Sequence, residues 1–525
     1  MTSPPTAPRT ADPPAPTSPP PPCPPPLTSA AAEFSRPPTK PFDVGIVGGG
    51  IAGVALALQL LRHGVAATVY EQGACFAEVG AGISLGPNAA RALELISPAL
   101  LAAAAGRAAR PRRGADDDDV WFDLRLGCCP YERGGGGGGG AAAGTGGEAG
   151  ERGGDAESGA AAAAAADPPP PVILRLRCKG GQVSMLRAHL LDELAALLPV
   201  GAARMGHHVV DCQPQPGGAG GVVLRFAHGA EARHDAVVAC DGIRSLVRRC
   251  VLGPDDPASS PVFSGKYAYR GLVPLDALHD ALGGEEELDP GPQMYLGRGG
   301  HVIAYPLWEA GVMNIVAFSN TPSWPDQSWV VSRTRDEMLA DFAGWHPRVR
   351  LFLSLMGPST SAWALFDHGV PAASFCDGRV CLAGDAAHAS TPHMGAGAGV
   401  ALEDACVLGA LLGDPAVRHA ADVEVAFRVF DAHRRARGLR VVADSRVQGR
   451  LYGLELDGDV DADPARVVES LRGRMRWLWD HDLDRELDEA RADLRGLLLG
   501  RRDGLSAGNQ GQGDLGVHVS PTGRL

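Results

Sequence analysis

The sequence predicts an α/β protein in which a parallel βαβ unit is joined to a mixed or antiparallel sheet and to a helical C-terminal part. Three patterns indicate this fold class. An apolar run, a glycine turn, a helical segment and a second apolar run follow one another within residues 42–70. Residues 262–318 contain short runs rich in Tyr, Val, Ile and Phe between Gly and Pro, and residues 420–456 have an Arg-rich helical pattern.

The first of these patterns is a βαβ unit of about 30 residues. Phe42–Val47 is mostly apolar, which predicts a buried strand, and three glycines follow it. Ile51–Arg62 carries apolar residues at helical spacing, and His63-Gly64 marks its end. Ala66–Tyr70 is a second apolar run that ends at Glu71, so a strand parallel to the first is expected.

The remaining elements follow from similar patterns along the chain. We expect buried strands wherever a short apolar run meets a turn signal, and helices wherever apolar residues recur every three to four positions. These expectations cover a strand at Val172–Leu176, a strand end and helix over Val183–Leu198, strands at Ala236–Ala239 and Arg379–Ala383, and helices at Gly397–Leu412 and Ala420–Leu456.

Low-complexity segments shorten the part of the 525 residues that is expected to fold. Sixteen of the 43 prolines precede Phe42, so residues 1–41 are expected to be a disordered Pro-rich tail. Residues 130–171 contain homopolymer runs of Gly and Ala and are expected to be a disordered insertion. Residues 501–525 are polar and Gly-rich, so a frayed tail is expected there.

Charge and composition exclude several classes of partner. The net charge of −13 gives no attraction to nucleic acid or to an anionic membrane. No window of 18 apolar residues and no secretory signal is found, so neither a membrane span nor export is expected and the predicted location is cytoplasmic. The eleven cysteines are scattered and odd in number, which indicates reduced thiols, and no metal site is predicted.

The glycine turn after the first strand has the spacing of a dinucleotide-binding loop, G-x-G-x-x-G. Gly48 permits the tight turn, Gly50 lets the backbone approach a pyrophosphate, and Gly53 lets the helix pack close to the strand. The amides at the helix N-terminus then hold negative phosphates. Glu71 follows at the end of the second strand, where a carboxylate accepts hydrogen bonds from ribose hydroxyls.

Two further strand-to-turn junctions carry an aspartate. The first places Asp241 after a buried strand, within the sequence DGIRS. The second places Asp385 after another strand, and Gly395-Ala396-Gly397-Ala398-Gly399 follows soon afterwards. An Asp at a strand end accepts from a polyol hydroxyl, and bare backbone with a helix N-terminus beside it suits a flat ring that carries negative charge.

These three motifs, in this order, resemble the fingerprints of the class A single-component FAD-dependent aromatic hydroxylases, and most of all salicylate-hydroxylase-like enzymes of the fungal type. They are the early glycine loop Gly48–Gly53, the middle "DG" motif Asp241–Arg248 and the late "GD" motif Gly384–Pro392. The resemblance covers roughly residues 42–500. Further familiar stretches are Val79–Asn88, Arg187–Leu194, Tyr269–Pro274 and Trp477–Asp482.

The resemblance implies non-covalent FAD and a set of residues that contact it. Glu71 is implied at the adenosine ribose and Asp385 at the ribityl chain. The segment from Gly395 to Ala398 is implied beneath the pyrimidine side of the flavin. The remaining implied contacts are Arg187 near the phosphates, Gly82 and Ser84 beside the ribose and ring, and Asp241 for both FAD and the transient nicotinamide cofactor.

The resemblance also implies a division into domains. A Rossmann-like FAD-binding domain is expected to be interleaved with a mixed or antiparallel-sheet substrate domain. The expected FAD-binding segments are 42–129, 172–261 and 371–415, the substrate domain is 262–370, and C-terminal helices occupy 416–500.

The implied reaction uses NADH or NADPH and O2, and a C4a-hydroperoxyflavin transfers oxygen to a phenolic or aromatic-acid substrate that is salicylate-like or polyketide-derived. A small aromatic substrate and O2 are thus the implied partners, and a monomer or homodimer is expected. Two alternatives remain open, an FAD-linked oxidase or reductase without oxygen insertion and a non-catalytic FAD-binding protein.

Two residues are candidates for contact with the substrate. Arg244 lies within the "DG" motif, after the strand, where an arginine stabilises a phenolate, and Tyr269 is placed to hydrogen-bond the same oxygen. Some fungal relatives use an Arg/Tyr pair in this way. The alternatives are a surface charge for Arg244, a tyrosine of the sheet core for Tyr269, and Arg270 as the group that holds the anion.

Overall fold

The computed structural model describes residues 31–76, 82–108, 119–128, 168–215, 220–284, 291–460 and 462–507. Most of the predicted tail and insertion lies outside these residues. The prediction of a tail up to residue 41 is wrong for its last part, because α1 (Ala31–Phe34) packs Phe34 into the core with 1% exposure. Lys40 then donates hydrogen bonds to the carbonyls of Asp414 and Val417. The high proline content of the preceding residues concealed this short anchor.

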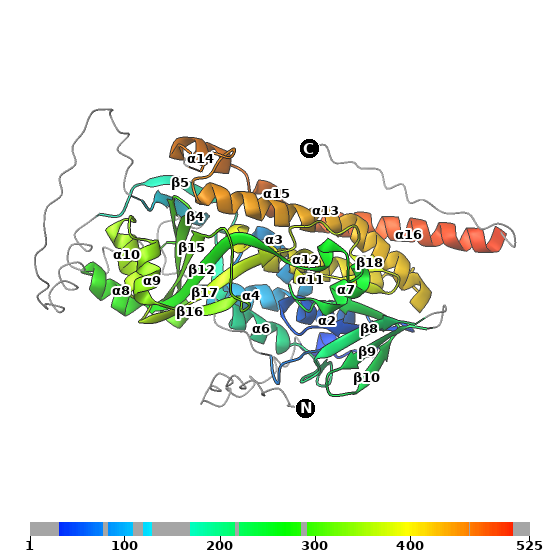
Figure 1. Ribbon diagram of the computed structural model, residues 1–525. Coiled ribbons are helices and arrows are strands. Elements are labelled where there is room, and N and C mark those ends of the chain that lie inside the picture. The colour runs from blue at the N-terminus through cyan, green and yellow to red at the C-terminus, as the bar shows by residue number, and fades with distance from the viewer. Residues whose placement is uncertain are drawn as a thin grey trace, which may run out of the picture.

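The predicted βαβ unit forms the centre of a six-stranded sheet (Figure 1). β1 (Asp43–Val47) lies between β2 (Ala66–Tyr70) and β11 (Ala236–Ala239) and runs parallel to both, and α2 (Ile51–Arg62) connects β1 to β2. The observed bounds of α2, β2 and β11 equal the predicted ones. The strands, in order across the sheet, are β18 (Cys376–Asp377), β19 (Val380–Leu382), β11 (Ala236–Ala239), β1 (Asp43–Val47), β2 (Ala66–Tyr70) and β7 (Ala203–Arg204).

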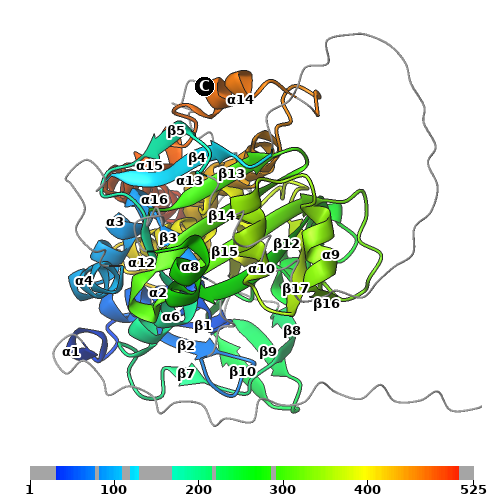
Figure 2. The same ribbon diagram turned by 90° about the vertical axis from the view of Figure 1, so that its left-hand side faces the viewer.

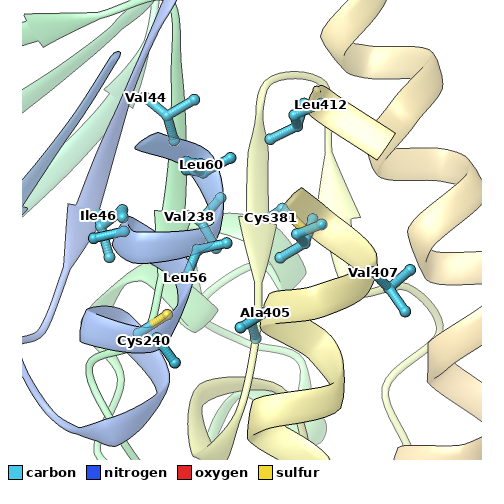
Figure 3. Packing of buried hydrophobic residues seen from close by; sticks show 14 of the residues in the cluster. Val44, Ile46, Leu56, Leu60, Val238, Cys240, Cys381, Ala405, Val407 and Leu412 are labelled. Carbon is cyan, nitrogen blue, oxygen red and sulfur yellow. The ribbon is translucent and has the colours of Figure 1, made fainter. Parts of the chain in front are cut away.

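Apolar side chains hold this sheet against α2 and α12 (Gly397–Leu412), as Figure 3 shows. Val44, Ile46 and Val238 of the strands are fully buried, and Leu56 of α2 lies among them. α12 runs beside α2, and Gly409 of α12 permits this close approach because a Cβ there would lie 2.6 Å from the Cβ of Gln59. The sheet edge at which β1 ends is therefore fixed by a continuous core.

The second large sheet has eight strands and is antiparallel except where β13 runs parallel to β4. Helices α8, α9 and α10 lie against one of its faces (Figure 2). The strands, in order, are β16 (Val330–Thr334), β17 (Ser359–Asp367), β12 (Val262–Pro274), β15 (Val312–Asn320), β14 (Gly300–Leu307), β13 (Gln293–Gly297), β4 (Val120–Leu126) and β5 (Val172–Arg177), and the helices are α8 (Leu275–Leu282), α9 (Arg335–Asp341) and α10 (Pro347–Ser354).

Two strands of this sheet contradict the predicted domain boundaries. β4 and β5 lie in segments that were predicted to belong to the FAD-binding domain, yet they pair with β13 and with each other in the eight-stranded sheet. The pairing of Gln293 with Asp123 joins residues far apart in the sequence, and no local pattern identifies such a partner. The prediction of an α/β fold with a mixed or antiparallel second sheet is confirmed.

The C-terminal helices lie along one side of the molecule (Figure 1). α13 (Ala420–Tyr452) and α16 (Leu483–Ala507) both pack against α12. The prediction of a frayed end from residue 501 is wrong for its first part, because α16 continues to Ala507. The smaller elements are α3 (Pro87–Ile96), α4 (Pro98–Arg107), β3 (Gly82–Leu85), β6 (Val183–Leu186), α6 (Arg187–Ala195), β8 (Val209–Pro214), β9 (Val222–Phe226), β10 (Glu231–His234), α7 (Leu246–Leu252), α11 (Asp385–His388), α14 (Pro464–Leu471) and α15 (Arg476–Trp479).

Candidate active site

One cavity of about 760 Å³ lies between the carboxyl edge of the six-stranded sheet and one face of the eight-stranded sheet. Its volume is in the upper part of the range typical of small-molecule and cofactor sites. Eleven of the thirteen residues predicted for the site line it, and the two exceptions are Gly53 and Tyr269. The eleven are Gly48, Gly50, Glu71, Gly82, Ser84, Arg187, Asp241, Arg244, Asp385, Gly395 and Ala398.

The glycine loop forms one end of the cavity, directly after β1. Gly48 has φ = +102°, and a Cβ there would overlap the carbonyl group of Cys240. Gly50 is the N-cap of α2 and offers no side chain to cap its amides. Gly53 does not line the cavity, since it packs against the Gly48 carbonyl, where a Cβ would overlap the oxygen. The loop therefore leaves the N-terminus of α2 open to a ligand.

Three carboxylates follow the strands on either side of this loop. Glu71, after β2, accepts hydrogen bonds from the Gly49 amide at 2.8 Å and the Gly73 amide at 2.6 Å. Asp241, after β11, accepts from the Leu246 amide through Oδ2, whereas its buried Oδ1 has no partner among the described residues. Burial raises the pKa of Asp241. Asp385, after β19, is exposed although both of its neighbours are buried.

The opposite wall near Asp385 is bare backbone. Gly395 has φ = +60°, and a Cβ there would lie 3.2 Å from the ring of Trp121. Gly397, the first residue of α12, has only an Asp385 carboxylate oxygen, at 3.8 Å, near the position of an added Cβ. This wall provides a flat surface beside the N-terminus of a long helix, which attracts negative charge.

The short β3–β6 ladder supplies a third wall. Gly82 and Ser84 lie on β3, and the Ser84 hydroxyl is 3.1 Å from that of Ser184. A Cβ on Gly82 would lie 2.6 Å from the Tyr305 hydroxyl, so glycine is required for this approach. Arg187 is the first residue of α6 and lines the same region.

Of the two residues predicted to contact the substrate, Arg244 lines the cavity and Tyr269 does not. Arg244 is exposed at the cavity, and its guanidinium lies 4.0 Å above the ring of Trp329. Tyr269 is 2% exposed and donates a hydrogen bond to Asp341 at 2.7 Å, on the sheet face that packs against α9. The prediction that Tyr269 contacts the substrate is therefore wrong. Successive residues of a strand point to opposite faces, so its neighbour Arg270 lines the cavity instead.

Arg270 makes no hydrogen bond or ion pair with a described residue through its guanidinium, which lies 5.0 Å from the ring of Trp363. Burial lowers its pKa, the nearby Tyr305 opposes this effect, and Arg187 adds to it. Burial also raises the pKa of Tyr305 to about 12. Sequence reasoning missed Tyr305, whose only signal is its alternation with Ile303 along β14.

Comparisons with known proteins agree with this geometry. A family model described as "FAD binding domain" matches residues 355–445. The chain is 39% identical over 467 residues to a salicylate hydroxylase of Pseudomonas putida, which covers 86% of this chain and 95% of that protein. It is 36% identical to a 6-methylsalicylate 1-monooxygenase of Aspergillus terreus, covering 85% and 91%.

The chain belongs to the family of FAD-dependent aromatic monooxygenases. A solved salicylate hydroxylase in a substrate complex shares 34% identity with it and superposes with a TM-score of 0.68, over 86% of this chain and 98% of that one. As a member of this family the protein is a flavoprotein oxidoreductase, and the predictions of family, FAD and enzyme class are confirmed.

The residues of the cavity fit FAD. An orphaned Asp241 oxygen, an exposed Asp385 and a glycine loop at the N-terminus of α2 meet where the parallel strands end, the position at which dinucleotides bind in such sheets. The flat segment from Gly395 to Ala398 leaves space that side chains would fill.

None of the described helices has the length and apolar character needed to cross a bilayer.

Two histidines that lie within the motif stretches Gly384–Pro392 and Trp477–Asp482 have structural partners. His388 follows Asp385 in α11, but its buried ring bonds Asp404 at 2.7 Å and does not line the cavity. His481 bonds Glu486 at 2.6 Å. By contrast, His301 and His393 do line the cavity, although no sequence signal identified them.

Proposed function

We propose that this monooxygenase hydroxylates a phenolic or aromatic-acid substrate, with NADH or NADPH and O2 as co-substrates, and that Arg270 and Tyr305 hold the anionic oxygen. The observation that carries this proposal is the guanidinium of Arg270, which faces the cavity without a carboxylate partner among the described residues. The names of the relatives, salicylate hydroxylase and 6-methylsalicylate 1-monooxygenase, support the same substrate class.

The chemistry of Arg270 favours an anion. An unpaired guanidinium in a half-buried position is costly, and a phenolate or carboxylate beside it removes that cost. A cation close to a phenol lowers the pKa of the phenol, so that the phenol ionises more readily. The ring of the resulting phenolate has a higher electron density than that of the neutral phenol. Tyr305, with its raised pKa, stays a hydrogen-bond donor and directs the same oxygen toward Arg270.

When bound, FAD supplies the transfer of electrons from the nicotinamide and the activation of oxygen. We assign to the protein the tasks of binding, orientation and exclusion of water. Apolar side chains of the eight-stranded sheet and its neighbours enclose the space in front of Arg270 and keep water from the reacting atoms. They are Phe122, Met294, Ile303, Val316 and Phe318.

The predicted cofactor contacts enter the proposal with the roles that the sequence indicated. Glu71 would bind the adenosine ribose, Asp385 the ribityl chain, and Arg187 the phosphates. Gly48, Gly50, Gly82, Ser84, Asp241, Gly395 and Ala398 would line the cofactor, and Gly53 would act by packing.

Arg244, stacked on Trp329, is assigned to the rim of the cavity, not to the reacting oxygen. A monomer or homodimer in the cytoplasm completes the proposal. The described cysteines are free thiols, as is usual in a reducing compartment.

Turnover with a panel of phenols tests the proposal. Holoenzyme is given NADH or NADPH with salicylate, hydroxybenzoates and resorcylic phenols, and NAD(P)H oxidation, peroxide release and product mass are followed under ¹⁸O2. We expect substrate-stimulated oxidation and a product that contains one ¹⁸O atom. A product without added oxygen would favour an oxidase or reductase, and FAD that neither nicotinamide reduces would favour a binding protein.

A variant tests the residue assignment. Arg270→Gln is expected to lower kcat/KM roughly 10- to 100-fold, the loss that accompanies removal of a charged hydrogen bond. Arg249→Gln is the matched control, because Arg249 is exposed on α7 and lies outside the cavity. Equal activities of the two variants would contradict the role of Arg270.

A further inference from the structure

The cavity face of β14 carries polar side chains at two separate positions. Tyr305, Ile303 and His301 alternate along this strand and all line the cavity. Tyr305 lies four positions after His301, which corresponds to about 13 Å of extended strand. The backbone of Arg270 is in register, through Val316, with Ile303, midway between the two positions. The charged and polar groups that act on Arg270 are Tyr305 and Arg187, whereas those that act on His301 are His393 and Lys266. Arg270 thus belongs with Tyr305, and His301 lies beyond Ile303.

The surroundings of His301 hold its ring in one orientation. The side chain is 1% exposed and stacks on Phe318, with ring centroids 4.2 Å apart and planes inclined by 13°. The rings of His393 and Tyr452 lie 5.1 Å and 5.0 Å away. Nδ1 of His301 and both ring nitrogens of His393 are buried and have no hydrogen-bond partner among the described residues.

Buried polar atoms without partners are uncommon and require an explanation. The charged group near this pair is Lys266, which donates a hydrogen bond to Asn320. Both imidazoles are kept neutral, because burial and Lys266 lower the pKa of His393 to about 3, and burial, His393 and Lys266 hold the pKa of His301 well below its usual range. A neutral imidazole offers one N–H donor and one acceptor, so it suits a neutral oxygen group better than a carboxylate.

We propose that His301, together with His393, forms a second subsite that recognises a neutral hydroxyl or carbonyl group of the substrate. This inference rests on the proposed hydroxylation of a phenol held by Arg270, and it narrows the substrate class. The preferred substrate is a phenol that carries a second, uncharged oxygen group on the side of the ring away from Arg270. Unsubstituted salicylate occupies only the Arg270 end.

The subsite is tested with two ligands of similar shape, 4-hydroxyacetophenone and 4-ethylphenol, which each carry a single phenol hydroxyl and differ in one carbonyl oxygen on the far side of the ring. Their dissociation constants for the oxidised holoenzyme are measured from changes in the flavin spectrum, and kcat/KM is measured for both. We expect His301→Phe to weaken binding of the ketone about ten-fold, the loss of one hydrogen bond, and to change binding of the ethyl compound less than two-fold.

Two further variants complete the design. His301→Gln keeps a donor and an acceptor and is expected to recover part of the preference for the ketone. His433→Phe is the matched control, because His433 pairs with Asp493 at the surface between α13 and α16. If His301→Phe does not retain FAD, the smaller His301→Leu, which also lacks a donor and an acceptor, takes its place, and a ratio of the two dissociation constants equal to that of wild type overturns the subsite.

The proposed function and the second subsite are refuted by different results. If neither ligand binds to or is hydroxylated by the wild-type enzyme, nor any other phenol of the panel, the proposed function fails. If phenols are hydroxylated but His301→Phe weakens both ligands equally, or neither, the proposed function stands and the second subsite is refuted.

Discussion

Arg434 is a buried cation whose replacement should damage this protein strongly through electrostatics. It is 0% exposed on α13 and donates hydrogen bonds to Asp404 at 2.8 Å, Glu486 at 2.8 Å and Glu403 at 2.6 Å. Asp404 in turn accepts from the amide of Gly384, the residue directly before Asp385. Replacement by Met keeps the approximate volume and removes the charge, so that three buried carboxylates lose their shared cation.

The magnitude follows from the burial of these carboxylates. Removing one partner of a buried ion pair typically costs about 3–5 kcal/mol, because it leaves an uncompensated charge. Arg437 remains on Glu403, and histidines remain on Asp404 and Glu486, so we expect Arg434→Met to cost about 3 kcal/mol. FAD affinity should also fall, because the turn that carries Asp385 loses its support.

The pH dependence of stability distinguishes the loss of the Arg434 charge from a packing defect. Burial alone would raise the pKa of Glu403, Asp404 and Glu486, but Arg434 and its neighbours hold all three below their usual values. Carboxylates with a lowered pKa stabilise the folded state above their unfolded pKa, and this contribution is lost as pH falls through the folded pKa. Wild type should therefore lose stability below about pH 4.5, and its advantage over Arg434→Met should shrink there.

Thermal unfolding and FAD titration measure the prediction. Tm is recorded by flavin fluorescence and by circular dichroism between pH 7 and pH 4 for wild type, Arg434→Met and Arg435→Met. Arg435 is the control, since it forms a half-exposed pair with Asp431 on the same helix, a type of pair worth about 0–1 kcal/mol. A Tm of Arg434→Met within a degree of that of Arg435→Met, or a deficit that does not change with pH, would refute the reasoning.

Three other substitutions have expected outcomes. Gly48→Ala should abolish FAD binding or folding, because φ is +102° and a Cβ would overlap the Cys240 carbonyl; retained flavin absorbance after gel filtration would contradict this. Tyr269→Phe should leave kcat/KM within two-fold and cost about 1 kcal/mol of stability through its lost bond to Asp341, and a large loss of kcat/KM would restore Tyr269 as a substrate contact. Asp385→Ala should weaken FAD at least ten-fold in an equilibrium titration, with little change in the Tm of the apoprotein.

Much of the cofactor site was predictable because its signals are local. A strand, three glycines and a helix occupy consecutive residues, so the loop from Gly48 to Gly53 and the position of Glu71 follow from the pattern. Asp241 and Asp385 were identifiable as the polar residues directly after buried strands. The structure brings these three carboxylates to one edge because β2, β11 and β19 run in the same direction in one sheet.

The substrate side was less predictable, because it depends on which face each residue presents. The prediction selected Tyr269, and the cavity is lined by its neighbour Arg270, since a shift of one residue along a strand reverses the face. Tyr305 and His301 belong to another strand, which β15 separates from β12. No pattern in a single sequence states that these strands lie near each other.

By itself the sequence determined the α/β class, the dinucleotide loop and the family, because each depends on residues close together in the chain. The tertiary structure alone decided that β4 and β5 join the eight-stranded sheet, that Arg434 compensates three carboxylates, and that Arg270 faces the cavity with no ion-pair partner in the part of the chain that the structure describes. Those features arise from contacts between distant segments. Their formation depends on the free energy of the whole fold, and for that reason local propensity does not reveal them.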